Sequence, residues 1–299
     1  MQITAKAPAK INITLDILSR RPDGYHDVDM IMQAVSLYDE VTVTADPAST
    51  EAGEITITCN KAGVPLDSSN IVYKCAKAFF EHTGRTHGDM TIHIEKTIPF
   101  GAGLAGGSAD GAAVIVILNR MYDTKLKEDE LCKIGDRVGA DIPFCILGGT
   151  KRATQTGTTL SKLPKLPSCY VLICKPEVSV STAKAYALAD SRTGAKFSYT
   201  DLAVKALYSG SIRNVSDFLH NDFEEVLSLD VINSIKSVML KSKACGSAMS
   251  GSGSAVFGLF LTEKKAQKCA ETLRESYEDV FLCEPCRTGV VITDILYDE

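Results

Sequence analysis

Several features are missing from this 299-residue sequence, and each absence narrows the possible functions. No apolar run approaches the ~20 residues that a transmembrane helix needs, and residues 1–6 contain no apolar core of a signal peptide. Positive charge is not in excess either, because the formal net charge is -5. A surface that binds nucleic acid or an anionic membrane needs clustered Lys and Arg, so we expect neither partner.

The ten cysteines lack the spacing of a disulfide framework or of a structural zinc site. They are scattered along the chain, and several lie in apolar runs such as residues 170–174. We therefore expect buried free thiols in a reducing cytoplasm. Cys283 and Cys286 form a lone CxxC motif, and no second CxxC or HxxxH motif supplies further zinc ligands. We expect two ordinary thiols near a strand, and no zinc.

The hydrophobic pattern predicts strands and helices that do not strictly alternate, which is typical of an α+β protein. Strands are expected at residues 11–18, 40–44, 54–58, 90–95, 170–174, 255–260 and 289–292. Helices are expected at residues 71–82, 111–118, 128–138, 181–189, 230–240 and 263–277. Two prolines within residues 161–168 indicate a linker, which divides the chain into domains of residues 1–162 and 163–299.

A glycine-rich segment at residues 99–110 lies between a predicted strand and an apolar helix. Glycine lets a ligand approach the backbone closely, and the following helix offers free N–H groups and the positive end of its dipole. Such a loop binds phosphate without a basic side chain. We therefore expect contacts to a phosphate-bearing ligand from Pro99, Phe100, Gly101, Ala102, Gly103, Leu104, Ala105, Gly106, Gly107, Ser108 and Ala109.

The loop does not match the common phosphate-binding families. Gly101, Gly103 and Gly106 have the spacing of a dinucleotide fingerprint, but the required second strand with an acidic residue ~20 positions on is missing. A Walker A loop ends in Gly-Lys-Ser/Thr, whereas this loop has no Lys. No His-Arg-Asp or Asp-Phe-Gly motif of a protein kinase follows. The loop alone leaves the identity of its phosphate-bearing ligand open, and a dehydrogenase is kept as an alternative although the second strand is missing.

Two pairs of residues suggest a function that no single member suggests alone: Lys10 with Asp141, and Tyr25 with His26. Lys10 begins the first predicted strand, and Asp141 lies in an expected turn. Together they could form a base–cation pair, in which a carboxylate takes the proton of an attacking hydroxyl and an ammonium orients it. Tyr25 and His26 follow a Pro-Asp-Gly turn. They could stack on and hydrogen-bond a planar base, or simply pack.

Three segments in this order resemble the motifs of the GHMP kinases, named for galactose, homoserine, mevalonate and phosphomevalonate. The segments are residues 8–12, 99–108 and 249–257. Residues 21–26, Arg-Pro-Asp-Gly-Tyr-His, resemble the branch that phosphorylates a cytidine-diphosphate-linked methylerythritol on the route to isoprenoid precursors. The resemblance implies a two-domain GHMP kinase fold. Its N-terminal domain is like ribosomal protein S5 domain 2, and its C-terminal domain is ferredoxin-like.

The resemblance also implies an ATP-dependent kinase that uses Mg²⁺, and roles for individual residues. Asp141 is the implied general base toward the 2-hydroxyl of the erythritol moiety. Lys10 orients that hydroxyl and stabilises charge on the transferred phosphoryl group, and Asn12 helps to hold the substrate. Asn70 and Lys96 lie where the family contacts adenine.

The implied partner is a small-molecule cytidine-diphosphate substrate. Tyr25 is expected to stack on cytosine and His26 to read its hydrogen-bonding edge. Thr182 and Tyr186 match positions that hold the ribose and the other face of cytosine. Another GHMP kinase, of the homoserine or mevalonate type, is the alternative within the superfamily, and a nucleic-acid-binding module of S5-like fold would need a basic face.

The loop departs from the family pattern at three positions. Ala105, Ala109 and Asp110 stand where the family usually has Gly, Ser and Asn. Ala109 therefore lacks a hydroxyl, and Asp110 is expected to add a negative charge near the phosphates. Ser108 is the candidate protein ligand of Mg²⁺.

Overall fold

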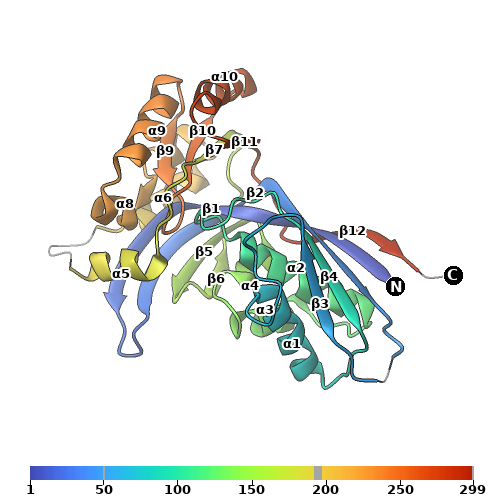
Figure 1. Ribbon diagram of the computed structural model, residues 1–299. Coiled ribbons are helices and arrows are strands. Elements are labelled where there is room, and N and C mark those ends of the chain that lie inside the picture. Colours follow the sequence, from blue (N-terminus) through green and yellow to red (C-terminus); the bar gives the residue numbers. More distant parts are fainter. Residues whose placement is uncertain (50, 192–196, 298–299) are drawn as a thin grey trace.

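Two β-sheets with helices packed against them make up the computed structural model, which describes residues 1–49, 51–191 and 197–297 (Figure 1). The first sheet has eight strands, in the order β12-β1-β2-β4-β3, with β5 and β6 extending from β2 and β8 beside β1. The second sheet has four strands, in the order β11-β7-β10-β9. Both sheets combine with helices that do not alternate regularly with strands, which confirms the α+β class.

A long antiparallel ribbon forms the centre of the first sheet. It consists of β1 (Gln2–Arg20) and β2 (His26–Ala45), joined by the predicted Pro-Asp-Gly turn. The pairing shifts register at Pro8/Ala9 and again at Asn12/Thr14. Pro8 cannot donate a ladder hydrogen bond, and it stands at such an irregularity, where Pro is tolerated. The segment of β1 between these two shifts carries Lys10, and bulged segments of this kind re-aim side chains.

Shorter strands extend the ribbon on both sides. They are β3 (Ile55–Cys59), β4 (Met90–Glu95), β5 (Thr150–Gln155), β6 (Thr159–Lys162), β8 (His220–Asn221) and β12 (Val291–Leu296).

Four helices accompany the first sheet: α1 (Ile71–Thr83), α2 (Gly106–Met121), α3 (Glu128–Asp136) and α4 (Ile142–Leu147). Helix α2 packs against β1 and β2 on one side and against α1 and α4 on the other, so it is buried almost all round, as its apolar sequence predicts. Helix α1 begins after Asn70, whose side chain accepts a hydrogen bond from the Val72 N–H at 3.0 Å. This cap confirms the predicted start of the helix.

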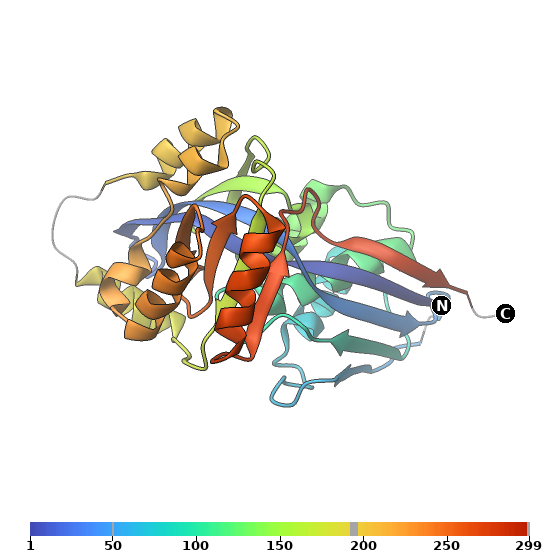
Figure 2. The same cartoon turned by 90° about the horizontal axis from the view of Figure 1, so that it is seen from above.

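The second sheet has the strand order of a ferredoxin-like unit, which confirms that expectation. Its strands are β7 (Tyr170–Lys175), β9 (Gly246–Met249), β10 (Val256–Phe260) and β11 (Asp279–Cys283), and its helices are α9 (Asp230–Lys241) and α10 (Glu263–Arg274). Both helices lie over one face of the sheet (Figure 2). Between β7 and α9 the chain forms α5 (Thr182–Asp190), α6 (Tyr199–Tyr208), α7 (Ile212–Ser216) and α8 (Asp222–Leu227).

The last strand returns to the first sheet. Strand β12 pairs antiparallel with β1, so Leu296 lies opposite Gln2, and Figure 1 shows β12 beside the beginning of β1. The division at residues 162/163 stays a prediction. Among the described residues, no helix is both long and apolar enough to cross a membrane.

Candidate functional site

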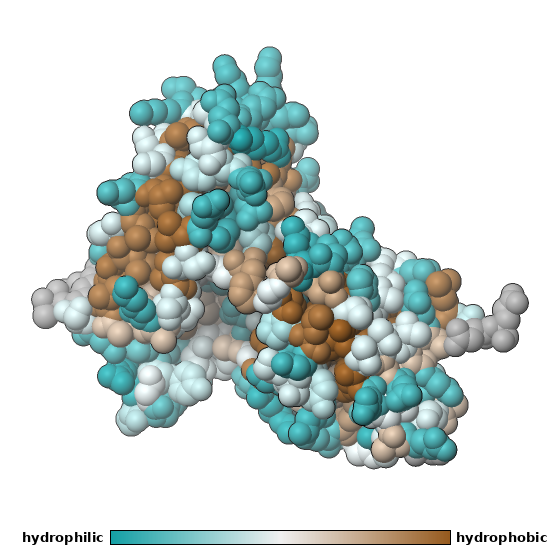
Figure 3. Space-filling model, in the orientation of Figure 1, coloured by the Kyte–Doolittle hydropathy of each residue, from teal (hydrophilic) through white to brown (hydrophobic). Residues whose placement is uncertain are grey.

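A cleft of ≈ 520 Å³ lies where the glycine-rich loop meets the second sheet and α5. In the space-filling view the surface is notched between the lobe that carries α9 and α10 and the lobe that carries α1 and α2 (Figure 3). Segments far apart in the sequence line this cleft: Lys10, Asn12, Leu15, Met30, Ile71, Lys96, residues 99–108, Asp141, Val180, Thr182, Tyr186, Phe223 and residues 251–253.

The N-terminus of α2 opens into this cleft without a side-chain cap. Its N-cap residue is Ala105, which has a left-handed φ of 59° and no side chain that could accept a hydrogen bond. The first turn, Gly106 to Ser108, contains no acidic residue. N–H groups that a helix leaves unsatisfied at its start attract anions, and the helix dipole adds to this attraction. The geometry therefore fits the phosphates of a nucleotide.

A second glycine-rich turn, residues 250–254, holds the loop in place. The Ser250 hydroxyl donates to the Gly103 carbonyl at 2.9 Å and accepts from the Asn12 N–H at 3.2 Å. The Ala255 N–H donates to the Ala102 carbonyl at 3.0 Å. A Cβ at Gly103 would overlap the Ser250 carbonyl, so only glycine permits this contact. The loop is thus fixed before any ligand binds.

Lys10 and Asp141 meet in the cleft, as the base–cation hypothesis requires. The Lys10 Nζ lies 3.8 Å from Asp141 Oδ2 and donates to Asn12 Oδ1 at 2.6 Å. The Lys10 side chain is only 6% exposed, whereas that of Asp141 is 31% exposed and accessible to a ligand. Asp141 is the N-cap residue of α4, a short helix that the sequence analysis had taken for a turn. An accessible carboxylate beside a buried ammonium suits proton abstraction from a hydroxyl.

Known proteins match this chain over most of its length. Residues 70–149 match the model for the GHMP kinases N terminal domain, and residues 203–279 match the model for GHMP kinases C terminal. A 4-diphosphocytidyl-2-C-methyl-D-erythritol kinase of Caldicellulosiruptor saccharolyticus is 40% identical over 94% of this chain and 96% of its own. One of Clostridium novyi is 40% identical over 93% of this chain and 98% of its own.

The chain belongs to the 4-diphosphocytidyl-2-C-methyl-D-erythritol kinase family. A crystal structure of 4-(cytidine 5'-diphospho)-2C-methyl-D-erythritol kinase superimposes with a TM-score of 0.78 and 28% identity, covering 95% of this chain and 99% of that one. The chain is therefore an ATP-dependent kinase with a small-molecule substrate, and the dehydrogenase alternative is wrong.

The structure places most of the residues expected from the family in the cleft. Four of the expected residues do not line the cleft: Asn70, Ala109, Tyr25 and His26. Those that line it are Lys10, Asn12, Lys96, Pro99, Phe100, Gly101, Ala102, Gly103, Leu104, Ala105, Gly106, Gly107, Ser108, Asp141, Thr182 and Tyr186.

The two residues expected at adenine are already engaged in protein contacts. Besides capping α1, Asn70 donates through Nδ2 to the Pro65 carbonyl at 2.6 Å. The buried Lys96 Nζ donates to the carboxylates of Asp39 and Asp110, with 2.8 Å to Asp110 Oδ2. Asp39, which the sequence analysis missed, also accepts from the N–H of Ile98 at 2.8 Å and so fixes the entry to the loop. The adenine contacts stay a prediction.

Asp110 does not bring its charge to the cleft, contrary to the expectation from the sequence. It is 4% exposed, pairs with Lys96 on the protein side of α2, and is not a lining residue. Burial raises the pKa of Asp110 well above its usual value. The phosphate end of the cleft is therefore without an acidic side chain from the first turns of α2.

Two of the residues expected at cytosine, His26 and Tyr186, are in contact with each other. The His26 ring stacks on Tyr186, with 4.4 Å between ring centroids and 16° between planes, and His26 Nε2 lies 2.6 Å from Asp190 Oδ1. Tyr25 next to it is 68% exposed. Burial raises the pKa of Tyr186 to about 12, so its hydroxyl stays neutral. The cytosine contacts remain a prediction.

Two further polar residues support the cleft, and the sequence analysis assigned no individual role to either. Asn221 donates through Nδ2 to the carbonyls of Met249 and Gly251, both at 2.8 Å, and so shapes the second glycine-rich turn. The Ser252 hydroxyl lies 2.8 Å from Thr182 Oγ1. Asn221 lies 30 residues from Gly251 in sequence, so no local pattern could indicate the contact.

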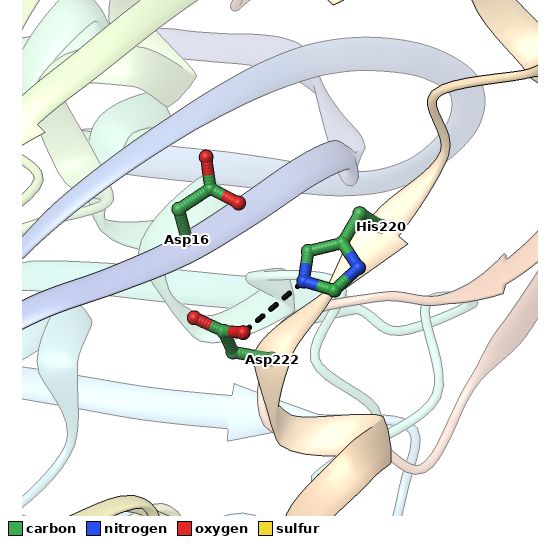
Figure 4. Close-up of side chains that lie close together, drawn as sticks. All are labelled: Asp16, His220 and Asp222. Atoms are coloured by element: carbon green, nitrogen blue, oxygen red, sulfur yellow. Dashed lines mark hydrogen bonds and ion pairs between the residues drawn. The ribbon is translucent and has the colours of Figure 1, made fainter. Parts of the chain in front are cut away.

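One group of three potential metal ligands exists among the described residues, and it lies outside the cleft. Asp16, His220 and Asp222 come together where β8 joins β1, with both carboxylates on the same side of the His220 ring (Figure 4). Hydrogen bonds already occupy them: Asp16 Oδ2 accepts from Thr200 N–H at 2.9 Å, and Asp222 Oδ2 accepts from Ile17 N–H at 2.6 Å. We regard the group as a structural tie between β8, α6 and β1.

In the cleft, the side-chain oxygens that suit Mg²⁺ are the Ser108 hydroxyl and the Asp141 carboxylate. The two thiols of the CxxC motif lie elsewhere. Burial raises the pKa of Cys283 to about 12, and the Cys286 Sγ lies 3.0 Å from the Tyr38 hydroxyl. All ten cysteines are free. The absence of zinc stays a prediction.

Proposed function

We propose that this kinase transfers the γ-phosphoryl group of ATP to the 2-hydroxyl of 4-diphosphocytidyl-2-C-methyl-D-erythritol, in isoprenoid precursor biosynthesis. The observation that carries the proposal is the Lys10–Asp141 pair, 3.8 Å apart in a cleft that also receives the uncapped N-terminus of α2. The names of the relatives supply the acceptor. Ten unpaired cysteines further favour action in the cytoplasm.

The nucleotide is proposed to lie with its phosphates at the first turn of α2. Backbone N–H groups there would hold the β- and γ-phosphates, because the loop is fixed by Ser250 and the first turn of α2 contains no acidic side chain. Phosphoryl transfer asks for little covalent chemistry from the protein, so positioning and charge stabilisation dominate.

The acceptor hydroxyl is proposed to lie between Asp141 and the phosphates. Asp141 would take its proton, while the Lys10 ammonium, held by Asn12 Oδ1, would orient the oxygen and stabilise the charge on the transferred group. Mg²⁺, when bound with ATP, would neutralise phosphate charge, with Ser108 and Asp141 as the available protein oxygens.

Cytosine is proposed to bind at Tyr25, His26 and Tyr186, with the ribose at Thr182. Because His26 and Tyr186 stack on each other, the base would lie against the outer face of one of these rings rather than between them. The exposed Tyr25 ring is free to cover the base. A kinase of the homoserine or mevalonate type would not need this aromatic group, so ATP turnover with each of the three acceptors distinguishes them.

The test of the catalytic assignment is Asp141→Asn. This change keeps the shape of the side chain and removes the base, so we expect kcat to fall by roughly 10²–10⁴, with little change in the Kd for ATP. Asp136→Asn, on the exposed side of α3, is the matched control and should leave kcat unchanged. A near-normal kcat in Asp141→Asn, at wild-type melting temperature, would remove Asp141 from the mechanism.

A further inference from the structure

A second cavity, of ≈ 690 Å³, lies where the two sheets meet and shares no lining residue with the cleft described above. Three separate parts of the chain form it: residues 148–151 at the start of β5, residues 162–170 between β6 and β7, and residues 284–287 after β11. Gln33 of β2 and Leu261 complete the lining. A volume of this size suits a small organic ligand.

The charged residues at this cavity are mostly of one sign. Lys151, Lys162, Lys165 and Arg287 face a single carboxylate, Glu284, which leaves an excess of three positive charges (4 − 1). The chain as a whole has the opposite balance, with a net charge of -5. Like charges gathered in a concave site raise the local concentration of anions.

These four cations have no acidic partner within the described part of the chain. Two cations elsewhere on the surface each have one: Lys6 lies 3.6 Å from Glu40, and Arg137 lies 3.0 Å from Glu81. Their donors are thus available to a ligand. A guanidinium and several ammonium groups converging on one space match the oxygens of a phosphate group.

The wall of the cavity is fixed in advance by buried polar contacts. The Thr150 hydroxyl donates to Gln33 Oε1 at 2.6 Å and accepts from the Leu166 N–H at 3.0 Å. Gln33 Nε2 donates to the Cys286 carbonyl at 2.9 Å. These contacts tie all three parts of the wall together, and a preformed site loses less conformational entropy when a ligand binds. Apolar side chains lie beside the cations: Leu163, Leu166, Tyr170 and Leu261.

We propose that this cavity binds a small organic diphosphate with an apolar portion, at the same time as the nucleotide cleft is occupied. A diphosphate carries two to three negative charges, which matches the excess of three positive charges. The apolar portion would lie on Leu166, Tyr170 and Leu261. Nucleic acid does not fit this description, because the cations line a concave site rather than an extended face.

The proposal is tested by calorimetric titration of the full chain with n-pentyl diphosphate, in saturating ADP and CDP. We expect saturable one-to-one binding that weakens as salt rises. Inorganic pyrophosphate should bind more weakly and n-pentanol should not bind measurably. The double variant Lys165→Glu/Arg287→Glu should weaken binding by roughly tenfold or more, because two donors become repulsive. Both residues are exposed, so the fold should be unaffected.

The matched control is Lys264→Glu/Lys268→Glu on the exposed side of α10, which changes the net charge equally and should leave binding unchanged. A neutral pair, Lys165→Gln/Arg287→Gln, should show a smaller loss than the reversed pair. Three results would each overturn the proposal: no saturable binding, competition by ADP or CDP, or an equal loss in the control on α10.

Discussion

The two glycine-rich turns of the cleft use glycine for different physical reasons. In the first, residues 99–108, a Cβ at Gly101 or Gly107 would meet no protein atom within 4 Å. In the second, residues 250–254, a Cβ at Gly251 would lie 3.0 Å from the Gly103 carbonyl, and one at Gly253 would lie 2.7 Å from Met249 Sδ. Open glycines leave room for a ligand, whereas packed glycines leave room for another part of the protein.

Gly103 belongs to the first turn but behaves like a residue of the second. Its φ is 74°, and its Cβ position is occupied by the Ser250 carbonyl. A glycine-rich motif read from sequence therefore mixes two functions. The residues that bind ligand and the residues that hold the loop can be told apart only by what stands beside each one.

The largest effect is expected when a packed glycine is changed. Gly103→Ala combines a left-handed φ with a backbone overlap, so it should lower the free energy of unfolding by about 3 kcal/mol. Gly101→Ala is the matched control, because φ is 62° there but the space is open. Gly101→Ala should lower the free energy of unfolding by only about 1 kcal/mol. Urea denaturation of both variants measures the difference, and equal losses would contradict the distinction between open and packed positions.

The contact between the two glycine-rich turns should also depend on the Ser250 hydroxyl. Ser250→Ala leaves the Asn12 N–H and the Gly103 carbonyl without their buried partner, which should cost about 1–3 kcal/mol of unfolding free energy. Ser252→Ala, two residues on, removes only a contact to Thr182 and should cost less than ~1 kcal/mol. If Ser250→Ala were as stable as wild type, the second turn would not be what holds the first.

An open glycine should separate ligand binding from stability. Gly107→Ala adds a methyl group where phosphate is proposed to approach the α2 N-terminus, so the KM for ATP should rise about tenfold. The same change should raise the free energy of unfolding by up to about 1 kcal/mol, because alanine favours helix. A KM within twofold of wild type would place the phosphates elsewhere.

The smallest effect is expected at Ala105, the one non-glycine residue of this loop with a left-handed φ, 59°. Ala105→Gly removes steric strain of about 1 kcal/mol from the folded protein. Part of this gain is lost, because glycine gives the unfolded chain more backbone entropy. We expect the free energy of unfolding, measured by thermal denaturation, to rise by about 0.5 kcal/mol. A loss of stability would show that the Ala105 methyl group makes stabilising packing contacts.

Much of this fold follows from local sequence patterns. Helix α1 and strand β4 lie where the Asn cap and the alternation of residues 90–95 predict them. Helix α4 was missed because Pro143 looks like part of a turn, although proline is acceptable in the first turn of a helix. The two-residue strand β8 has no periodicity that could indicate it.

The site was predictable in part. The family motifs indicated that Lys10 and Asp141 belong together, and the structure brings them together. Of the residues that hold the surrounding loops in place, Asp39 and Asn221 lie outside these motifs, and Ser250 lies in the motif of residues 249–257 without any indication of its partners. Ser250 is separated from Asn12 by 238 residues, and only the folded topology brings the pair into contact. Sequence patterns identify the groups that act, but not the groups that position them.

Strand β12 has a consequence for how this protein is made. The ribosome delivers β1 first and β12 last, yet the two strands are neighbours in the sheet. Until residues 291–296 emerge, one edge of the nascent β1 has unpaired N–H and C=O groups along residues 2–6, and such an edge can pair with other chains. The first sheet therefore cannot be completed until the whole ferredoxin-like unit has been synthesised.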